Sequence, residues 1–513
     1  MSTRTKKTSI NFIVGVIYQF VFLFSQFILR SVIIQKLGAE YLGLSSVVTS
    51  ILTVLNLTEM GFASAIVFSL YKPLVDGDKS KIKALLWYYR KIYKIIGFII
   101  MAIGLAITPF LHSFINQDVP TDVNIYIIYL VYLVNTVLSY LLFSYKRSIL
   151  IADQKNYFIT IVNLSLVLVQ TIVQITLLIL FKNFYLFVFT LPFITLINNL
   201  LIAIITRKYY KDYFVKEELD TQTKEELKIK ISGLFIIKLA NSSRTGFDNI
   251  FISAFLGLSL VAIHSNYYYI VTGVGTFLGI VTNSMSASVG NKVALDTVEN
   301  NYKDFNKFDF MYMVITGICC ITMFVLYQPF MSVWVGDNML LPFGTMCSFV
   351  VYFYCTKMYS IRSMYNDVRG LWWEQKFRTI FEAIANIILN LILVIYLGVL
   401  GIMLASIITM LIFSFGMSSK ITFKHYFGND KLKNYYINHA IYAIVTIFIA
   451  LIVYYTSTFI TVNNLYLEII LKGIFALSVS SILYFILYLR NRHMKQNINL
   501  IKKVLLKIKS TNK

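Results

Sequence analysis

An arginine inside an apolar stretch near the start of the chain is the first residue that could do chemistry. Arg30 lies near the end of residues 9–34, which contain no acidic side chain. A guanidinium in a membrane span costs about 2.5–3.5 kcal/mol, so it usually faces a cavity or a protein partner. Gln19, Gln26 and Arg30 share one helical face, which predicts a polar stripe facing a water-filled interior. The alternative is that Arg30 extends along its helix to the lipid headgroups.

A second arginine stands beside an acid in a later apolar stretch. Arg244 and Asp248 are four residues apart and share a helical face, with Asn241 one turn earlier. One interpretation is a structural ion pair that neutralises itself. The other is that Asp248 restrains Arg244 until an anion or a cation competes for one of the two.

Two further acids lie inside apolar stretches. Three interpretations of Glu59 are open: it packs between helices, it pairs with Arg30, or it binds a proton. Glu382, Asn386 and Asn390 recur every four residues and form one polar face. That face either lines a lumen or makes hydrogen bonds between helices.

Three other ionisable residues are expected to contact the headgroup region or water. Lys357 and Arg362 lie near the inner end of their span, where we expect them to reach the headgroup region. His264 lies at the outer edge of its span, where we expect it to contact water.

Signatures of catalysis and of metal binding are missing from the sequence. It contains no Gly-Lys-Ser/Thr phosphate loop, no nucleophile–His arrangement and no metal-ligand spacing. Its four cysteines lie in apolar stretches without a CxxC motif. We therefore expect no catalytic residue, no metal and no cofactor, and transport rather than an enzyme activity. Such transport would draw on a gradient of ion or substrate.

The composition identifies the elements that position these residues. The 513 residues are 58% hydrophobic and 14% charged, with a mean hydropathy of +0.71. This balance is typical of an all-α polytopic membrane protein. The net charge of +22 does not indicate nucleic-acid binding, because the Lys and Arg residues lie in short loops between apolar stretches.

About fourteen membrane spans are predicted from hydropathy. They cover residues 10–34, 42–69, 90–114, 122–144, 157–181, 184–206, 231–256, 262–290, 308–334, 343–365, 378–396, 399–420, 438–461 and 467–489. Basic loops alternate along the chain with short loops that are nearly free of Lys and Arg. Because basic loops stay in the cytoplasm, both termini are predicted to be cytoplasmic.

The first half of the chain recurs in the second. Leu37-Gly38, Pro109-Phe110 and Gln154-Lys155 match Leu256-Gly257, Pro329-Phe330 and Gln375-Lys376, at separations of 219 to 221 residues. A repeat of six spans predicts two parallel lobes. We expect an N-lobe at 1–206, a cytoplasmic linker at 207–230, a C-lobe at 231–420, two extra helices at 421–489 and a basic tail at 490–513. Arg30 and Arg244 then come from equivalent helices and could face each other.

Four segments of the sequence resemble a known family. They are FILRSVIIQKLGAEYLGL, LTEMGFASAIVFSLYKPLVDGDKSKIKALLWYYRKIY, YKRSILIADQKNY and VRGLWWEQKFRTIFEAIANIILN. With the span count and the repeat, they resemble the bacterial polysaccharide flippases of the Wzx type. That family belongs to the superfamily that also holds the multidrug and toxic compound extrusion (MATE) transporters and the lipid II flippases.

The resemblance implies a function at the bacterial cytoplasmic membrane. A flippase of this type moves an undecaprenyl-pyrophosphate-linked oligosaccharide from the inner to the outer leaflet, for O-antigen, capsule or exopolysaccharide. It also implies a cationic central cavity, for which Arg30 and Arg244 are the matching positions. Arginine holds phosphate oxygens bidentately, which agrees with such a ligand. The candidate coupling ions are Na+ and H+, and a polysaccharide polymerase is a candidate partner.

Two alternatives remain open at this point. A multidrug cation antiporter of the same superfamily would need acids in its first-lobe cavity, and the first lobe offers only Glu59. A membrane polysaccharide polymerase or ligase would carry its catalytic site on a large outer loop. The predicted outer loops have about ten residues or fewer, which is too short for such a site.

Overall fold

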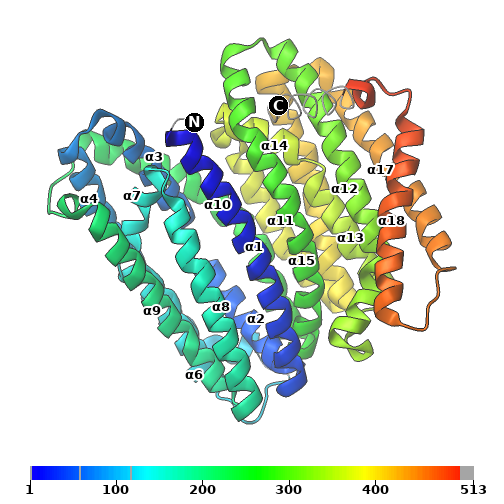
Figure 1. Ribbon diagram of the computed structural model, residues 1–513, viewed down its shortest axis with the longest axis horizontal. Helices are drawn as coiled ribbons and strands as arrows, with labels where there is room; N and C mark the ends of the chain where they lie inside the picture. Colours follow the sequence, from blue (N-terminus) through cyan, green and yellow to red (C-terminus); the bar gives the residue numbers. More distant parts are fainter. Residues whose placement is uncertain (1–2, 57–58, 116–117, 497–513) are drawn as a thin grey trace, which may run out of the picture. The chain divides into compact units, whose positions relative to one another are not determined.

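The computed structural model describes the backbone of residues 3–56, 59–115 and 118–496. It describes the side chains of residues 10–56, 66–115, 118–228, 246–286 and 288–496. Every regular element within these ranges is a helix (Figure 1). The predicted all-α membrane fold is confirmed, whereas the side chains of Arg244, Asn241 and Glu59 and the end of the basic tail lie outside the described residues.

The chain divides by its contacts into two compact units, Met1–Ser265 and Asn266–Lys513. The boundary lies within one long helix, beyond the linker predicted at 207–230. The assignment of 1–206 and 231–420 as two lobes stays a prediction.

The first unit contains ten helices and the start of an eleventh within the described residues. They are α1 (Thr3–Lys36), α2 (Ala39–Leu55), α3 (Glu59–Asp76), α4 (Lys79–Ile107), α5 (Leu111–Phe114), α6 (Ile125–Leu141), α7 (Arg147–Ala152), α8 (Asn156–Phe181), α9 (Phe184–Tyr209), α10 (Thr221–Leu256) and the first turns of α11 (Leu258–Leu295). Short 3-10 turns lie at η2 (Thr108–Phe110), η3 (Ser144–Lys146) and η4 (Lys211–Tyr213).

The second unit holds the rest of α11 and the helices that follow it. They are α12 (Val298–Val335), α13 (Phe343–Lys357), α14 (Ser360–Arg369), α15 (Trp372–Thr409), α16 (Ser418–Thr422), α17 (Leu432–Ser457) and α18 (Leu465–Tyr488). Two segments are π-helical, η6 (Met410–Met417) and η7 (Phe423–Phe427). Short 3-10 turns lie at η5 (Asp337–Met339) and η8 (Asn429–Lys431).

Nine helices in the described part of the chain are long and apolar enough to cross a membrane, or ten if α6 and the bent segment after it form one span. Part of the difference from the predicted fourteen comes from breaks and turns, and α10 is counted only from Gly246 onward, because the side chains before it lie outside the described residues. The predicted second span is divided between α2 and α3. The eleventh and twelfth spans both lie in the run from α15 into η6, with a sharp turn at Gly398 (φ 55°, ψ −133°).

The turn at Gly398 folds the chain back on itself. A Cβ added to Gly401 would lie 2.1 Å from the carbonyl oxygen of Leu393. Residues eight apart in a straight helix are about 12 Å apart along its axis. The two arms of α15 are therefore a tight hairpin, as the two predicted spans at 378–396 and 399–420 require.

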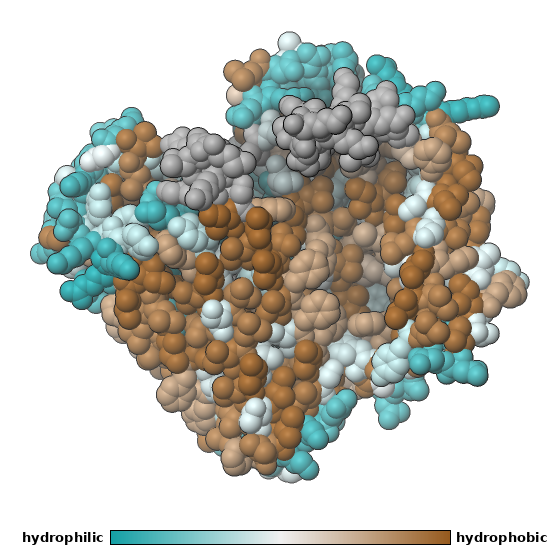
Figure 2. All heavy atoms as spheres, in the orientation of Figure 1, coloured by the Kyte–Doolittle hydropathy of each residue, from teal (hydrophilic) through white to brown (hydrophobic). Residues whose placement is uncertain are grey.

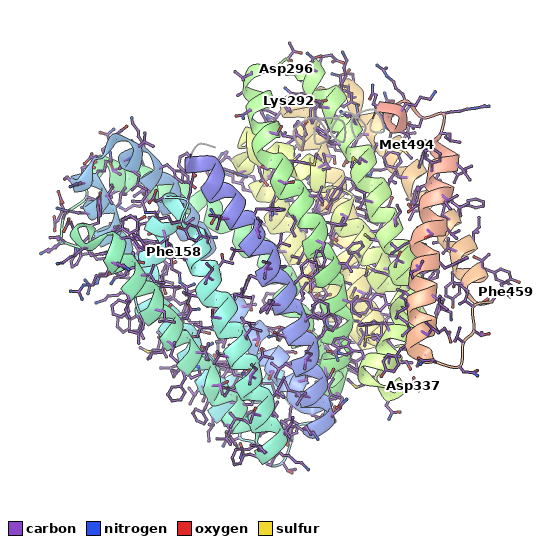
Figure 3. All side chains as sticks on the ribbon, in the orientation of Figure 1. Phe158, Lys292, Asp296, Asp337, Phe459 and Met494 are labelled. Atoms are coloured by element: carbon purple, nitrogen blue, oxygen red, sulfur yellow. The ribbon has the colours of Figure 1, made fainter. Side chains whose placement is uncertain are left out.

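A polar loop adjoins each end of α12. Figure 3 shows Asp296 in one of these loops and Asp337 in the other, at opposite ends of the helix. Asp296 accepts hydrogen bonds from the Asn300 side chain and from the Thr297 amide, both at 2.8 Å, and they lower the pKa of its carboxyl group. Charged residues at helix ends and apolar residues between them agree with a multi-pass membrane protein.

Apolar side chains cover the outside of the helices. In Figure 2, hydrophobic residues lie along α1 and α8, and hydrophilic residues gather where α3 and α4 meet. Phe24 and Ile28 of α1 are exposed, as are Ile172 of α8 and Ile474 of α18. Exposed apolar surfaces of this kind promote aggregation in water and are suited to contact with lipid.

Helix α2 packs closely against α10 and the start of α11. A Cβ on Gly43 would lie 2.0 Å from the carbonyl oxygen of Leu258, and one on Gly246 would lie 2.7 Å from the side chain of Val54. Only glycine allows two helix backbones to approach this closely. This contact brings the polar residues of α2, α10 and α11 together.

Candidate functional site

Arg30 is turned toward polar groups inside the first unit. Its Nη1 donates a hydrogen bond to the Ser265 hydroxyl at 3.1 Å, and the residue is half-buried. Ser46 of α2 donates to the same hydroxyl at 3.3 Å, and Ser265 donates to the Ala262 carbonyl at 2.9 Å. Of the two interpretations of Arg30, this contact supports the one in which the guanidinium faces the protein interior.

A second group of hydrogen bonds lies between the same helices. Asn249 of α10 donates to the Ser50 hydroxyl at 3.0 Å, and its Oδ1 lies 2.9 Å from Nδ1 of His264. His264 is only 3% exposed. The expectation that His264 contacts water was wrong, because α11 begins at Leu258 and His264 already lies more than one turn inside it, against α10.

Asp248 lies beside this group on α10. It is 3% exposed, which places its carboxylate inside the protein. Its predicted partner Arg244, and with it Asn241, lies outside the described side chains, as does Glu59. The Arg244–Asp248 pair and the roles of these three residues stay predictions.

The two glutamines of the predicted stripe lie on the inner side of α1. Gln19 and Gln26 are half-buried, whereas Phe24 and Ile28 of the same helix are exposed. Helix α1 packs along α8 in this unit, and Figure 1 shows the two side by side. The polar stripe therefore faces away from the lipid-facing residues, and its role in binding stays a prediction.

The predicted polar face on α15 belongs to the second unit. Glu382 forms an ion pair with Arg378 and accepts from the Ser414 hydroxyl at 2.8 and 2.9 Å. Asn386 donates to the Ser406 hydroxyl at 3.2 Å. All of these residues are buried. The bond from Asn386 to Ser406 joins the two arms of the hairpin, and the bonds from Ser414 join the first arm to η6. These are hydrogen bonds between helices, which is the structural one of the two interpretations; any role in transport stays a prediction.

Arg362 is a buried cation that sequence reasoning misplaced. It is 2% exposed, and it donates to the Ser414 carbonyl at 2.7 Å, to the Thr422 hydroxyl at 3.3 Å and to the Ser418 hydroxyl. The expectation that it reaches the headgroups was wrong. The signal was present in the sequence, since Ser414, Ser418 and Thr422 recur every four residues and offer one polar face.

Lys357 also turns inward. Its Nζ donates to the carbonyl of Gly275 on α11 at 3.3 Å and lies 5.7 Å from the ring centre of Phe353. It was expected to reach the headgroups. An unforeseen carbonyl in a neighbouring helix binds it instead.

A buried acid and a histidine join α12 to α17. Nε2 of His439 lies 3.0 Å from Oδ2 of Asp309, and both residues are buried. The rings of Phe415, Tyr435 and Tyr442 surround the imidazole, with centroids 4.4 to 5.6 Å away. No local pattern in the sequence indicated this pair, because the two residues are 130 positions apart and each lies at the start of a predicted span.

No group of three or more His, Cys, Asp or Glu residues that could hold a metal ion occurs where side chains are described. The polar groups described above suit hydrogen bonding and the binding of an anion. They include hydroxyls, amides and guanidinium groups, and the acids among them are paired or buried.

Comparisons with known proteins identify the fold. No protein-family model and no curated protein sequence matches the chain. A solved structure of the lipid II flippase MurJ in an inward closed conformation is similar, with a TM-score of 0.65 and 14% identity, covering 93% of this chain and 98% of that one.

Two transporter structures are similar as well. An inward-facing multidrug resistance MATE family transporter of the MOP superfamily has a TM-score of 0.61 and 13% identity, over 79% of this chain and 95% of its own. A point mutant of the Vibrio cholerae MATE transporter VcmN has a TM-score of 0.54 and 13% identity, over 82% of this chain and 98% of its own. At these identities the likeness shows a shared fold.

Proposed function

We propose that the chain is a flippase that moves an undecaprenyl-pyrophosphate-linked oligosaccharide from the inner to the outer leaflet by alternating access. The product would supply O-antigen, capsule or exopolysaccharide synthesis. The observation that carries this proposal is the inward-facing guanidinium of Arg30, bound to the Ser265 hydroxyl. The fold shared with a lipid II flippase structure supports it.

The surroundings of Arg30 suit the reversible binding of an anion. A hydrogen bond between a guanidinium and a phosphate oxygen is about twice as strong as one between neutral groups. A pyrophosphate can therefore compete for the guanidinium with the Ser265 hydroxyl. Ser265 and Ser46 would then donate their own hydroxyl hydrogens to phosphate oxygens.

Other predicted residues would bind the sugars or control Arg244. Gln19 and Gln26 would hydrogen-bond the sugars, and Asp248 would restrain Arg244 until the pyrophosphate arrives. Na+ or H+ would drive the cycle. The protein would lie in the bacterial cytoplasmic membrane with both termini inside, next to a polysaccharide polymerase.

The test is translocation of a fluorescent lipid-pyrophosphate oligosaccharide in proteoliposomes. We expect Arg30→Ala to reduce the rate by about tenfold to a hundredfold, because one charge-assisted contact is worth about 1.5–3 kcal/mol. Arg30→Lys should retain part of the rate, since it keeps the charge and loses the bidentate geometry. Ser265→Ala should reduce it less than Arg30→Ala.

The matched control is Lys182→Ala, which also removes one positive charge, but from an exposed position after α8. It should leave the rate unchanged. Full activity in well-folded Arg30→Ala and Ser265→Ala proteins would overturn the proposal.

A multidrug cation antiporter is the second candidate, favoured by the buried carboxylate of Asp248 and by the MATE transporter structures with the same fold. It predicts efflux of an organic cation by the intact protein, with loss in Asp248→Asn and none in Arg30→Ala. Cation efflux without lipid transport would establish this candidate in place of the flippase.

A further inference from the structure

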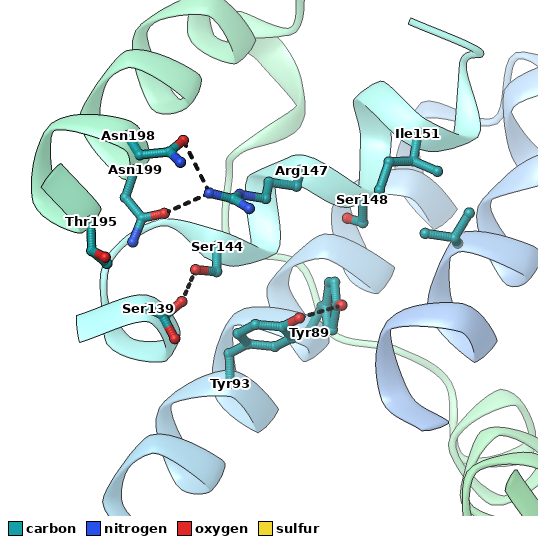
Figure 4. Close-up of a pocket in the computed structure, with 11 residues that line it drawn as sticks. Tyr89, Tyr93, Ser139, Ser144, Arg147, Ser148, Ile151, Thr195, Asn198 and Asn199 are labelled. Atoms are coloured by element: carbon teal, nitrogen blue, oxygen red, sulfur yellow. Dashed lines mark hydrogen bonds between the residues drawn. The ribbon is translucent and has the colours of Figure 1, made fainter. Parts of the chain in front are cut away.

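A polar cavity of about 430 Å³ lies within the first unit, and Arg30 is not among its lining residues (Figure 4). It is formed by α3, α4, α6, η3, α7 and α9. Its lining residues are Val67, Tyr89, Tyr93, Ser139, Ser144, Arg147, Ser148, Ile151, Thr195, Asn198 and Asn199. Small-molecule sites typically occupy about 300–1,000 Å³, so the cavity has room for a ligand larger than a single ion.

The cavity exists because the chain breaks between α6 and α7. Phe143 has a φ of +62°, a left-handed conformation that non-glycine residues rarely adopt. The helical segments on its two sides meet at 46°. The bend directs Arg147, the first residue of α7, toward α9.

Two asparagines hold the guanidinium of Arg147 in place. Its Nη2 donates to Oδ1 of Asn198 at 3.2 Å and to Oδ1 of Asn199 at 3.1 Å. Each amide is itself anchored, Asn198 through Asn163 at 2.9 Å and Asn199 through the Leu138 carbonyl at 3.2 Å. The cation is therefore preorganised, which reduces the entropy cost of binding a ligand.

The hydroxyls of the cavity donate to protein acceptors. Tyr89 donates to the Tyr93 hydroxyl at 3.0 Å, and Ser148 donates to the Tyr145 carbonyl at 2.7 Å. Because a hydroxyl rotates, an anion can compete with these acceptors for its hydrogen. Among the described residues that line the cavity, Arg147 alone carries a charge. Val67 and Ile151 add an apolar wall suited to an organic substituent.

We propose that this cavity binds a phosphate ester through Arg147, with the surrounding serine and tyrosine hydroxyls as further donors once they turn from their protein acceptors to the phosphate. Guanidinium groups and hydroxyls are the side chains that bind phosphate oxygens best. The volume beyond the phosphate accepts an attached group such as a sugar or glycerol. The site does not depend on the proposed transport, because it is built from residues other than those around Arg30.

The experiment measures binding to the full-length protein in detergent micelles. The probes are inorganic pyrophosphate, glycerol phosphate and short-chain phosphatidic acid. We expect glycerol phosphate or phosphatidic acid to raise the unfolding temperature, and Arg147→Met to weaken that binding about tenfold or more. Arg30→Ala should leave it unchanged, which separates this site from the proposed transport site.

The matched control is Arg90→Gln. Arg90 lies on α4 in the same unit but stacks on the rings of Trp87 and Tyr145 and does not line the cavity. It should bind the probes normally. Equal binding by Arg147→Met and Arg90→Gln overturns the proposal.

If Arg147→Met does not fold, the site can be tested in the protein without substitutions by chemical modification of its arginines. Phenylglyoxal modifies arginine, and mass spectrometry locates the modified residues. The probes should slow modification of Arg147 and leave that of Arg90 unaffected. Protection by phosphatidic acid alone identifies a lipid headgroup as the ligand, and protection by glycerol phosphate as well identifies a soluble ester. No protection by any probe overturns the proposal.

Discussion

Hydroxyl groups are the recurrent partners of arginine at the scale of single residues. Arg30 bonds Ser265, Arg362 bonds Ser418 and Thr422, and Arg378 bonds Ser414 at 3.0 Å. The burial of these arginines distinguishes a structural role from a role in ligand binding. Arg362 is enclosed by its partners and cannot reach a ligand without unfolding its site, whereas Arg30 is half-buried and accessible to one.

The Arg378–Glu382 pair allows a prediction about stability. Glu382→Leu should lower the free energy of unfolding by about 3–5 kcal/mol, because it leaves the buried guanidinium without its carboxylate. The double variant Arg378→Met, Glu382→Leu should recover most of that loss, since neither charge is then buried. Thermal unfolding in detergent measures both. A double variant that is less stable than the single one would show that the pair itself stabilises the fold.

The sequence predicted part of this residue-level picture. It placed Arg30, Gln19 and Gln26 on one helical face, because helical spacing alone decides that, whereas the direction of this face was left open between two interpretations. It missed Arg362, the Asp309–His439 pair and the cavity at Arg147. These depend on contacts between helices: Ser265 is 235 residues from Arg30, and Asn199 is 52 residues from Arg147. Spacing along one helix contains no information about such partners.

Close backbone approach is the feature that matters most at the scale of elements. Glycines at Gly43 and Gly246 let α2 lie against α10 and the start of α11, and this contact assembles Ser46, Asn249 and His264. Hydropathy predicted that these helices exist. It also separated two spans at residues 396 and 399, where the chain turns at Gly398. It could not predict the left-handed conformation of Phe143, because that conformation leaves the apolar content of the chain unchanged.

Two glycine substitutions test the importance of this approach. Gly43→Ala places a methyl group where the Leu258 carbonyl lies, which should cost about 1–3 kcal/mol or more and should also reduce transport. Gly15→Ala is the matched control within α1, because no atom lies within 4 Å of the added Cβ. It should be neutral or stabilise the helix by about 0.5–1 kcal/mol. Thermal unfolding compares the two, and equal stability would refute the close contact.

Charge distribution is the strongest signal at the scale of the whole molecule. The predicted topology places the loop with Asp296 in the cytoplasm and the loop with Asp337 outside, and these loops lie at opposite ends of α12 (Figure 3). Hydropathy and charge are enough to predict an order of spans and loops from the sequence, and the orientation stays a prediction. The division into units could not, since contacts between distant segments define it.

Labelling of single cysteines tests the orientation. In a variant whose four native cysteines are replaced by serine, Asp337→Cys should react with a membrane-impermeant maleimide added to intact cells. Asp296→Cys should react only after permeabilisation. The reverse pattern would invert the predicted topology, and labelling of both sites in intact cells would exclude it.

The π-helical segment Met410–Met417 has a consequence for changes in chain length. Hydrogen bonds in a π turn skip one residue more than in an α-helix, so the segment holds a surplus residue. Deleting the exposed Leu411 should convert the wide turn to an α turn and keep Ser418 and Thr422 facing Arg362. Deleting the exposed Ile172 in the regular helix α8 should instead rotate every later residue of that helix by about 100°. We therefore expect the gene encoding this protein to tolerate loss of a codon in this helix, whereas the same loss in α8 should turn the packed face of that helix away from its neighbours.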